Sequence, residues 1–165
     1  MSVDRVREYL KKFGLEEKVK EFEVSSATVE LAAKAAGVIP ARIAKTLSFK
    51  VGDCAVLVVT AGDAKIDNRK YKDQFGTKAR MLTPEEVIEY TGHAVGGVCP
   101  FDIRNEKVTA YLDVSMKRFD TMLPAAGSDS SCVVLTLEEL EKASCSAGWI
   151  DVCKLPDGDP STERN

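Results

Sequence analysis

The sequence predicts a single α/β domain, on the basis of its size, its hydrophobic content and two alternating hydrophobic periods. The chain has 165 residues, near the usual size of one domain, and 44% of them are hydrophobic, enough for a substantial core. Apolar side chains recur at helical spacing in some segments and alternate with polar ones in others. No internal repeat or linker divides the sequence. We therefore expect one domain over residues 1–154 and a disordered tail over residues 155–165.

The N-terminal part of the chain predicts two helices with a strand between them. Residues 3–13 carry apolar side chains at helical spacing, and Gly14 follows as a stop signal. Residues 19–24 alternate apolar and polar side chains, as in a half-buried strand. A second helix is expected to start after an N-cap at Ser26 and to end at Gly37.

The next segment predicts a β-hairpin. Pro40 starts a short helical turn, and at Lys45 the period changes to the alternation of a strand over residues 46–51. A two-residue turn then leads to a second strand over residues 54–59. A lysine at the junction of turn and strand is usually a solvent-facing charge. Its alternative role is a cationic anchor for a phosphate or for the carbonyl oxygen of an ester.

Two more helices are predicted before a glycine-rich loop. Residues 68–75 suit a basic helix that Gly76 ends. Thr83 is a strong N-cap for a helix over residues 84–90. Proline follows it at the first helical position, and acidic residues occupy the first turn, where the helix dipole favours them.

The C-terminal part predicts three strands and one helix. Residues 108–113 alternate and contain β-branched and aromatic side chains, residues 119–123 show a weaker strand pattern, and residues 132–137 show a strong one. A turn is expected over residues 124–128. The last helix is expected over residues 138–143.

The charge distribution excludes a nucleic-acid-binding protein that relies on a global basic field. The formal net charge is -3 and the sequence pI is about 5.3, so any contact with nucleic acid must be local. Basic side chains do cluster in one short segment: Lys65, Arg69, Lys70, Lys72, Lys78 and Arg80. The alternative interpretation is an ordinary solvated helix face.

Cysteine usage and the N-terminus predict a protein of the reducing cytoplasm. The five cysteines are odd in number, no pair has CxxC spacing, and one histidine cannot complete a usual zinc pattern. We therefore expect free thiols and no metal. The charged N-terminus lacks an apolar core, so neither a signal peptide nor a membrane span is expected.

A glycine-rich loop over residues 91–101 is the candidate functional site. It holds the only histidine of the chain, His93, together with Gly96, Gly97 and Pro100. Glycines let another molecule approach the backbone closely, and proline makes the loop rigid. Such a loop could present free amides to a carbonyl or phosphate oxygen. The alternative is a buried turn between a helix and a strand.

The remaining inventory of chemical groups supports hydrolysis of an activated substrate. A nucleophilic pair could only combine His93 with a residue such as Cys99, six positions away. The sequence contains no P-loop and no dinucleotide fingerprint. Backbone amides and one lysine are the groups left for catalysis.

Four short motifs follow one another in the order found in a known family. They are Ala44-Lys45-Thr46-Leu47-Ser48-Phe49, the Gly-His-x-x-Gly-Gly-Val-Cys-Pro-Phe pattern of residues 92–101, Tyr111-Leu112-Asp113, and the turn Ala126-Gly127-Ser128. Over residues 20–145 the chain resembles the YbaK/EbsC family of aminoacyl-tRNA deacylases, which includes the editing domain of prolyl-tRNA synthetase. The resemblance implies a mixed, mostly antiparallel curved sheet flanked by helices. It also implies hydrolysis of the ester that joins a wrong amino acid to tRNA.

The same resemblance suggests roles for ten residues. Lys45 matches the family lysine at the substrate pocket, and Gly96 with Pro100 matches a G-x-x-x-P loop. The chain departs from the family at Cys99, where serine is common, and at Asp102, where glycine is frequent. The implied catalytic groups are Lys45, Gly96 and Gly97, and the implied substrate-binding residues are Thr46, His93, Val95, Pro100, Asp113, Gly127 and Ser128.

We therefore expect a trans-editing deacylase that needs no cofactor. Its expected substrate is tRNA(Pro) carrying a small wrong amino acid such as alanine, cysteine, serine or threonine. Its expected partners are the acceptor end of that tRNA and, as a candidate, prolyl-tRNA synthetase, with no membrane. The alternative is a non-catalytic module of the same fold that binds tRNA or a synthetase.

Overall fold

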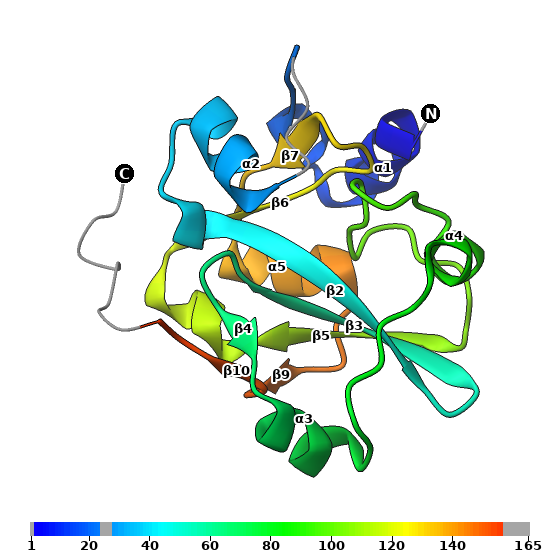
Figure 1. Cartoon of the computed structure of the whole chain (residues 1–165). Helices are drawn as coiled ribbons and strands as arrows, with labels where there is room; N and C mark the ends of the chain where they lie inside the picture. Colours follow the sequence, from blue (N-terminus) through cyan, green and yellow to red (C-terminus); the bar gives the residue numbers. More distant parts are fainter. Residues whose placement is uncertain (1, 24–27, 157–165) are drawn as a thin grey trace.

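The computed structural model describes residues 2–23 and 28–156 (Figure 1). Within these ranges no helix is both long enough and apolar enough to cross a bilayer. The helices are α1 (Ser2–Leu10), α2 (Val29–Ala36), α3 (Asn68–Phe75), α4 (Pro84–Thr91) and α5 (Leu137–Ser144). The strands are β1 (Val19–Glu21), β2 (Ile43–Val51), β3 (Cys54–Ala61), β4 (Lys65–Ile66), β5 (Val108–Asp113), β6 (Thr121–Pro124), β7 (Ser131–Val133), β8 (Leu135–Thr136), β9 (Trp149–Ile150) and β10 (Cys153–Lys154).

One mixed sheet organises the domain. Its six strands lie in the order β8-β6-β2-β3-β5-β9, and two smaller pairs, β1-β7 and β4-β10, lie outside it. Among the described residues the six-stranded sheet has two antiparallel and three parallel pairings, and both smaller pairs are antiparallel, which confirms a mixed sheet. The long curved hairpin of β2 and β3 crosses the molecule, with α2 near one end and α3 and β4 on one side (Figure 1).

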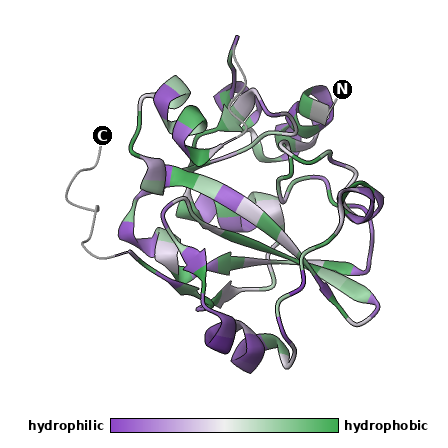
Figure 2. Ribbon diagram, in the orientation of Figure 1, coloured by the Kyte–Doolittle hydropathy of each residue, from purple (hydrophilic) through white to green (hydrophobic). Residues whose placement is uncertain are grey.

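The core forms on both sides of β3, a long and almost wholly buried strand. All its residues after Cys54 are buried, because β2 and β5 flank it on either edge. An aromatic row then attaches α3 to the sheet. The Phe49 and Tyr71 ring centroids are 5.0 Å apart, those of Tyr71 and Phe75 4.7 Å, and those of Phe75 and Tyr111 5.4 Å. Figure 2 shows that the residues of α3 are largely hydrophilic, in purple.

Local signals at helix ends are confirmed. Gly14 ends the first helical segment with a φ of 69°, and Gly37 ends α2 with a φ of 72°. The Thr83 side chain accepts a hydrogen bond from the Glu86 N–H, and the Glu86 side chain reciprocates, so a capping box starts α4. The bounds of α3 and β5 are the predicted ones.

Three boundaries were wrong. Lys45 is not at a junction: β2 already begins at Ile43, so Lys45 is a strand residue. The N-cap of α2 is Thr28, whose side chain accepts from the Leu31 N–H, while Ser26 lies outside the described residues. The predicted strand over residues 132–137 is two strands with different partners, because β7 pairs with β1 and β8 with β6.

Strands β4, β9 and β10 were missed, because two residues are too few to show a period. The predicted tail over residues 155–165 lies outside the described residues, apart from Leu155 and Pro156.

Candidate active site

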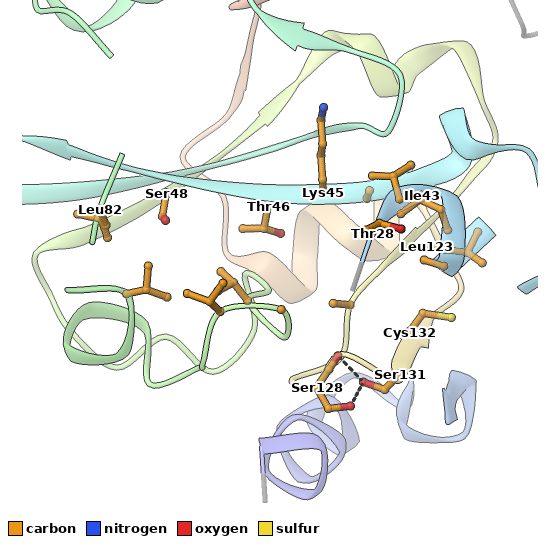
Figure 3. A pocket seen from close by; sticks show the side chains of 18 of the residues that line it. Thr28, Ile43, Lys45, Thr46, Ser48, Leu82, Leu123, Ser128, Ser131 and Cys132 are labelled. Carbon is orange, nitrogen blue, oxygen red and sulfur yellow. Dashed lines mark hydrogen bonds between the residues drawn. The ribbon is translucent and has the colours of Figure 1, made fainter. Parts of the chain in front are cut away.

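A cavity of about 380 Å³ lies between β2, α2, the glycine loop and the turn before β7. Figure 3 shows its lining from close by. Apolar walls come from α2, β2, α4 and β6, and hydroxyl groups come from β2 and the turn. The lining residues that carry hydroxyl or thiol groups are Thr28, Thr46, Ser48, Ser128, Ser131 and Cys132. The described lining contains no carboxylate and no imidazole.

The cavity exists because β2 loses its neighbour on one edge. Strand β6 pairs with it only at Ile43 and Ala44. The edge is next occupied at Ser48, whose carbonyl accepts from the Leu82 N–H at 3.1 Å, and at Lys50, whose N–H donates to the Arg80 carbonyl at 2.8 Å. Alternate residues of a strand direct their backbone groups to the same edge. The N–H and C=O of Thr46 therefore point into the opening between these two contacts.

Thr46 also brings an unsatisfied hydroxyl to the cavity. Its Oγ1 is buried and has no hydrogen-bond partner within the described residues. In Figure 3 the Thr46 and Ser48 side chains lie on the face of β2 that is turned toward Ser128 and Ser131. A buried hydroxyl without a partner costs about 1–3 kcal/mol. Such a group is well suited to a ligand that supplies the missing hydrogen bond.

The Gly96 amide of the glycine loop is available to a ligand. Gly96 lines the cavity with a φ of +99°, and its N–H has no partner among the described residues. The Gly97 N–H instead donates to the Ala94 carbonyl at 3.0 Å. The expectation that both amides face a substrate is therefore corrected to Gly96 alone. Val95 also lines the cavity.

Gly97 has a packing role. A Cβ at this position would lie 2.7 Å from the backbone of Gly127 and Ser128. The loop and the turn before β7 are therefore in direct backbone contact. Ser128 lines the cavity, and its hydroxyl donates to Ser131 Oγ at 2.8 Å, whereas Gly97 and Gly127 border a separate outer cleft.

Lys45 lies in the strand that forms the cavity wall, but its side chain points away. In Figure 3 it leaves β2 on the face opposite Thr46, away from Ser128 and Ser131. Burial lowers the pKa of Lys45, and the nearby Lys65 lowers it further, while Cys153 and Asp63 raise it. The expected arrangement, in which the ammonium faces the glycine loop, is therefore not the one in this structure.

Besides Gly127, three predicted binding residues do not line the cavity. His93 is fully buried, and its Nε2 donates to the Phe101 carbonyl at 2.9 Å, which secures the end of the loop. Asp113 is fully buried, and its carboxylate accepts from the N–H groups of Ser115 and Val152, each at 2.9 Å. Pro100 borders a small cleft elsewhere. These residues hold the scaffold.

Cys99 is unsuited to nucleophilic attack. It is fully buried, and burial raises the pKa of its thiol to about 12, so it stays protonated. Its Sγ is 3.6 Å from His93 Nε2, but that nitrogen carries the proton given to Phe101. All five cysteines are free thiols, and no group of three metal-ligating side chains occurs in the described part of the chain.

We expect His93 to make stability pH-dependent. Burial lowers the pKa of His93, whereas a histidine in the unfolded chain titrates near ~6.5. Below that pH the unfolded chain binds a proton that the folded chain excludes, so acid lowers the free energy of unfolding. Urea denaturation at about pH 7.5 and 5.5 should show a larger loss for the wild type than for His93→Gln. Equal losses in the two proteins would contradict a buried neutral imidazole.

The exit of the glycine loop is held by the N-terminal helix. Asp102 has a φ of +56°, a conformation that favours glycine. Its carboxylate accepts from Arg5 Nε at 2.5 Å and from Arg104 at 3.0 Å. Arg5 also donates to the Asp102 carbonyl and, at 3.0 Å, to the Gly92 carbonyl. Sequence reasoning missed Arg5, because its partners lie nearly one hundred residues away.

We expect Arg5→Ala to loosen this loop. The variant removes three hydrogen bonds from a partly buried guanidinium, so the free energy of unfolding should fall by about 1.5 kcal/mol or more. Arg104→Ala is the matched control, because its side chain is 74% exposed and bonds the same carboxylate. Urea denaturation of both variants tests the difference. Equal effects would show that Arg5 does not hold the loop.

Sequence comparisons identify relatives of this cavity-bearing fold. The aminoacyl-tRNA editing domain family matches residues 23–143. YwhH of Bacillus subtilis is 55% identical over 155 residues, which span 93% of this chain and 98% of that protein. The proline–tRNA ligase of Halalkalibacterium halodurans is 27% identical over 137 residues, which are 82% of this chain but only 23% of the ligase.

A solved structure supports the same relationship. A crystal structure of a protein proposed to be a trans-editing enzyme for prolyl-tRNA synthetase is 31% identical, with a TM-score of 0.84, and the match covers 93% of this chain and 97% of that one. The family match spans more than half of the sequence, including β2, the glycine loop and the turn before β7. The chain therefore belongs to the aminoacyl-tRNA editing domain family.

Proposed function

We propose that the chain is a trans-editing deacylase, which hydrolyses the ester between a wrong amino acid and tRNA(Pro) in the cytoplasm. The observation that carries the proposal is the cavity wall at Thr46, where an unpaired hydroxyl and open backbone groups line the same cavity as Gly96, whose N–H has no partner among the described residues. The family match and the resemblance to editing domains of proline–tRNA ligases support the same substrate class.

The reaction depends more on the positions of the ester and the attacking water than on a strong base. Water attacks the ester carbonyl, the bond to the ribose oxygen breaks, and that oxygen takes a proton as the free tRNA leaves. An N–H donor at Gly96 stabilises the negative charge that develops on the carbonyl oxygen. Because the described lining has no carboxylate or imidazole, hydroxyls, backbone groups and the substrate's own hydroxyl orient the water.

The walls favour a small amino acid side chain. Val29, Ile43 and Leu123 form an apolar end of the cavity, next to the thiol of Cys132. A cavity of about 380 Å³ must also admit part of the terminal ribose. Alanine, cysteine, serine and threonine remain the proposed set, since one methylene changes discrimination by only ~1–3 kcal/mol.

A panel of tRNA(Pro) species tests the proposal. Each species carries alanine, cysteine, serine, threonine or proline, and release of the amino acid is followed over time. We expect release of at least one small wrong amino acid and retention of proline. Binding without release from any species would favour the non-catalytic alternative. Adding prolyl-tRNA synthetase to the same assay tests the proposed partner, which should lower the KM.

A further inference from the structure

A basic surface lies next to the cavity, on the other face of β2. Residues 65–80 carry six basic and two acidic side chains, a surplus of four positive charges in a chain of net charge -3. Strands β4 and β10 and helix α3 lie together on one side of β2 (Figure 1), and α3 is strongly hydrophilic (Figure 2). The exposed basic side chains of this surface are Lys65, Arg69, Lys70, Lys72 and Lys154, and of these Lys70 pairs with Asp151.

The arrangement of these charges is unfavourable for the protein alone. Lys65 and Lys154 are direct partners in the antiparallel pair of β4 and β10. Like charges directly opposite each other on neighbouring strands destabilise the pair. Neither lysine has an ion-pair partner within 4 Å in the described part of the chain.

Three of the nearby carboxylates are already engaged. Asp63 makes two hydrogen bonds to Arg118, at 3.0 and 2.6 Å, and Asp151 pairs with Lys70 at 3.1 Å. Asp67 lies near Lys154, but one of its oxygens caps α3 by accepting from two backbone N–H groups. The positive charge of Lys65 and Lys154 is therefore incompletely neutralised within the protein.

Lys45 connects this surface to the cavity. Its side chain lies on the basic face, near Lys65, and the next residue, Thr46, directs its backbone groups to the open edge of β2 that borders the cavity. A bound molecule could therefore contact the basic face and reach the cavity by crossing a single strand edge.

We propose that the surface formed by Lys65, Lys154, Arg69 and Lys72 binds the sugar–phosphate backbone of the tRNA acceptor arm, whose 3′ end crosses β2 at Lys45 to enter the cavity. Phosphate contacts of this kind fix the position of a nucleic acid without reading its sequence. The inference rests on the proposed function, and it gives a protein of net negative charge a local means of holding RNA.

The test compares two double variants with equal charge change. Lys65→Gln/Lys154→Gln alters the proposed surface, and Lys12→Gln/Lys107→Gln alters exposed lysines next to α1 and β5. Binding of uncharged tRNA(Pro) is measured over a range of salt concentrations. We expect the first variant to reduce the slope of log K against log salt by about 2, and the control to leave the slope nearly unchanged. Equal slopes for both variants would overturn the proposal.

Hydrolysis assays distinguish a failure of this inference from a failure of the proposed function. With mischarged tRNA the first variant should raise KM and leave kcat unchanged, and its hydrolysis of an aminoacyl-adenosine, which lacks the acceptor arm, should match the wild type. An equal loss on both substrates would place these lysines in the folding or chemistry of the cavity and contradict the proposal. If the wild type hydrolyses neither substrate, the proposed function fails, while the binding slopes still report on the surface.

Discussion

Replacing Thr46 by valine is expected to stabilise the protein and to impair hydrolysis. Valine has nearly the same shape but removes the buried Oγ1, which has no partner among the described residues. Loss of an unsatisfied buried hydroxyl should raise the free energy of unfolding by about 1 kcal/mol. The substrate would lose a hydrogen bond in the cavity, so kcat/KM should fall by about tenfold or more, since 1.4 kcal/mol corresponds to a factor of ten.

Thr60→Val is the matched control for the gain in stability and the loss of hydrolysis that we expect for Thr46→Val. Thr60 lies opposite Lys45 on β3, is fully buried, and donates its hydroxyl hydrogen to the Ala61 carbonyl at 3.2 Å. Its loss should cost about 0.5–1.5 kcal/mol of stability and leave kcat/KM nearly unchanged. Urea denaturation and single-turnover deacylation measure the two quantities. A Thr46→Val protein with wild-type kcat/KM would remove the hydroxyl from the mechanism.

Replacing Gly97 by alanine is expected to have the largest effect on activity. The added Cβ would lie 2.7 Å from backbone atoms of Gly127 and Ser128, so the loop and the facing turn must move apart. Overpacking of this kind costs about 1–3 kcal/mol. Movement of about 1 Å at the Gly96 amide can cost about a hundredfold in rate. We expect a folded protein with kcat/KM reduced by about that factor.

Gly52→Ala separates this clash from a general effect of glycine replacement. Gly52 has a φ of +59° in the turn between β2 and β3, and a Cβ there would meet nothing within 4 Å. Its substitution should lower the free energy of unfolding by about 1 kcal/mol and leave deacylation intact. If Gly97→Ala keeps wild-type kcat/KM, the contact between loop and turn is not needed for activity.

Local signals in the sequence were sufficient for most elements of the fold. The N-cap at Thr83, the stop at Gly76 and the alternation of residues 108–113 depend on neighbouring residues, and the structure confirms each. The split between β7 and β8 depends on which distant strand each half meets, and no local pattern contains that information. The same limit applies to β9 and β10, which are two residues long.

The candidate site was predicted only in part, because local patterns again lack the information on distant contacts. Motif order pointed to Thr46, Gly96 and Ser128, and all three line the cavity. The direction of the Lys45 side chain depends on where β2 begins, and a start at Ile43 puts Lys45 and Thr46 on opposite faces. Ser48 was missed, although it shares the face of Thr46 two residues away, and strand alternation could have indicated it.

A crystal structure of the chain with a non-hydrolysable analogue of an aminoacyl-adenosine tests directly whether the cavity is the active site. We expect the aminoacyl group in the cavity between β2 and the glycine loop, with hydrogen bonds to Thr46 Oγ1 and the Gly96 N–H. An analogue bound instead in the outer cleft between Arg5 and Asp129, with the cavity unchanged, would show that the cavity is not the active site.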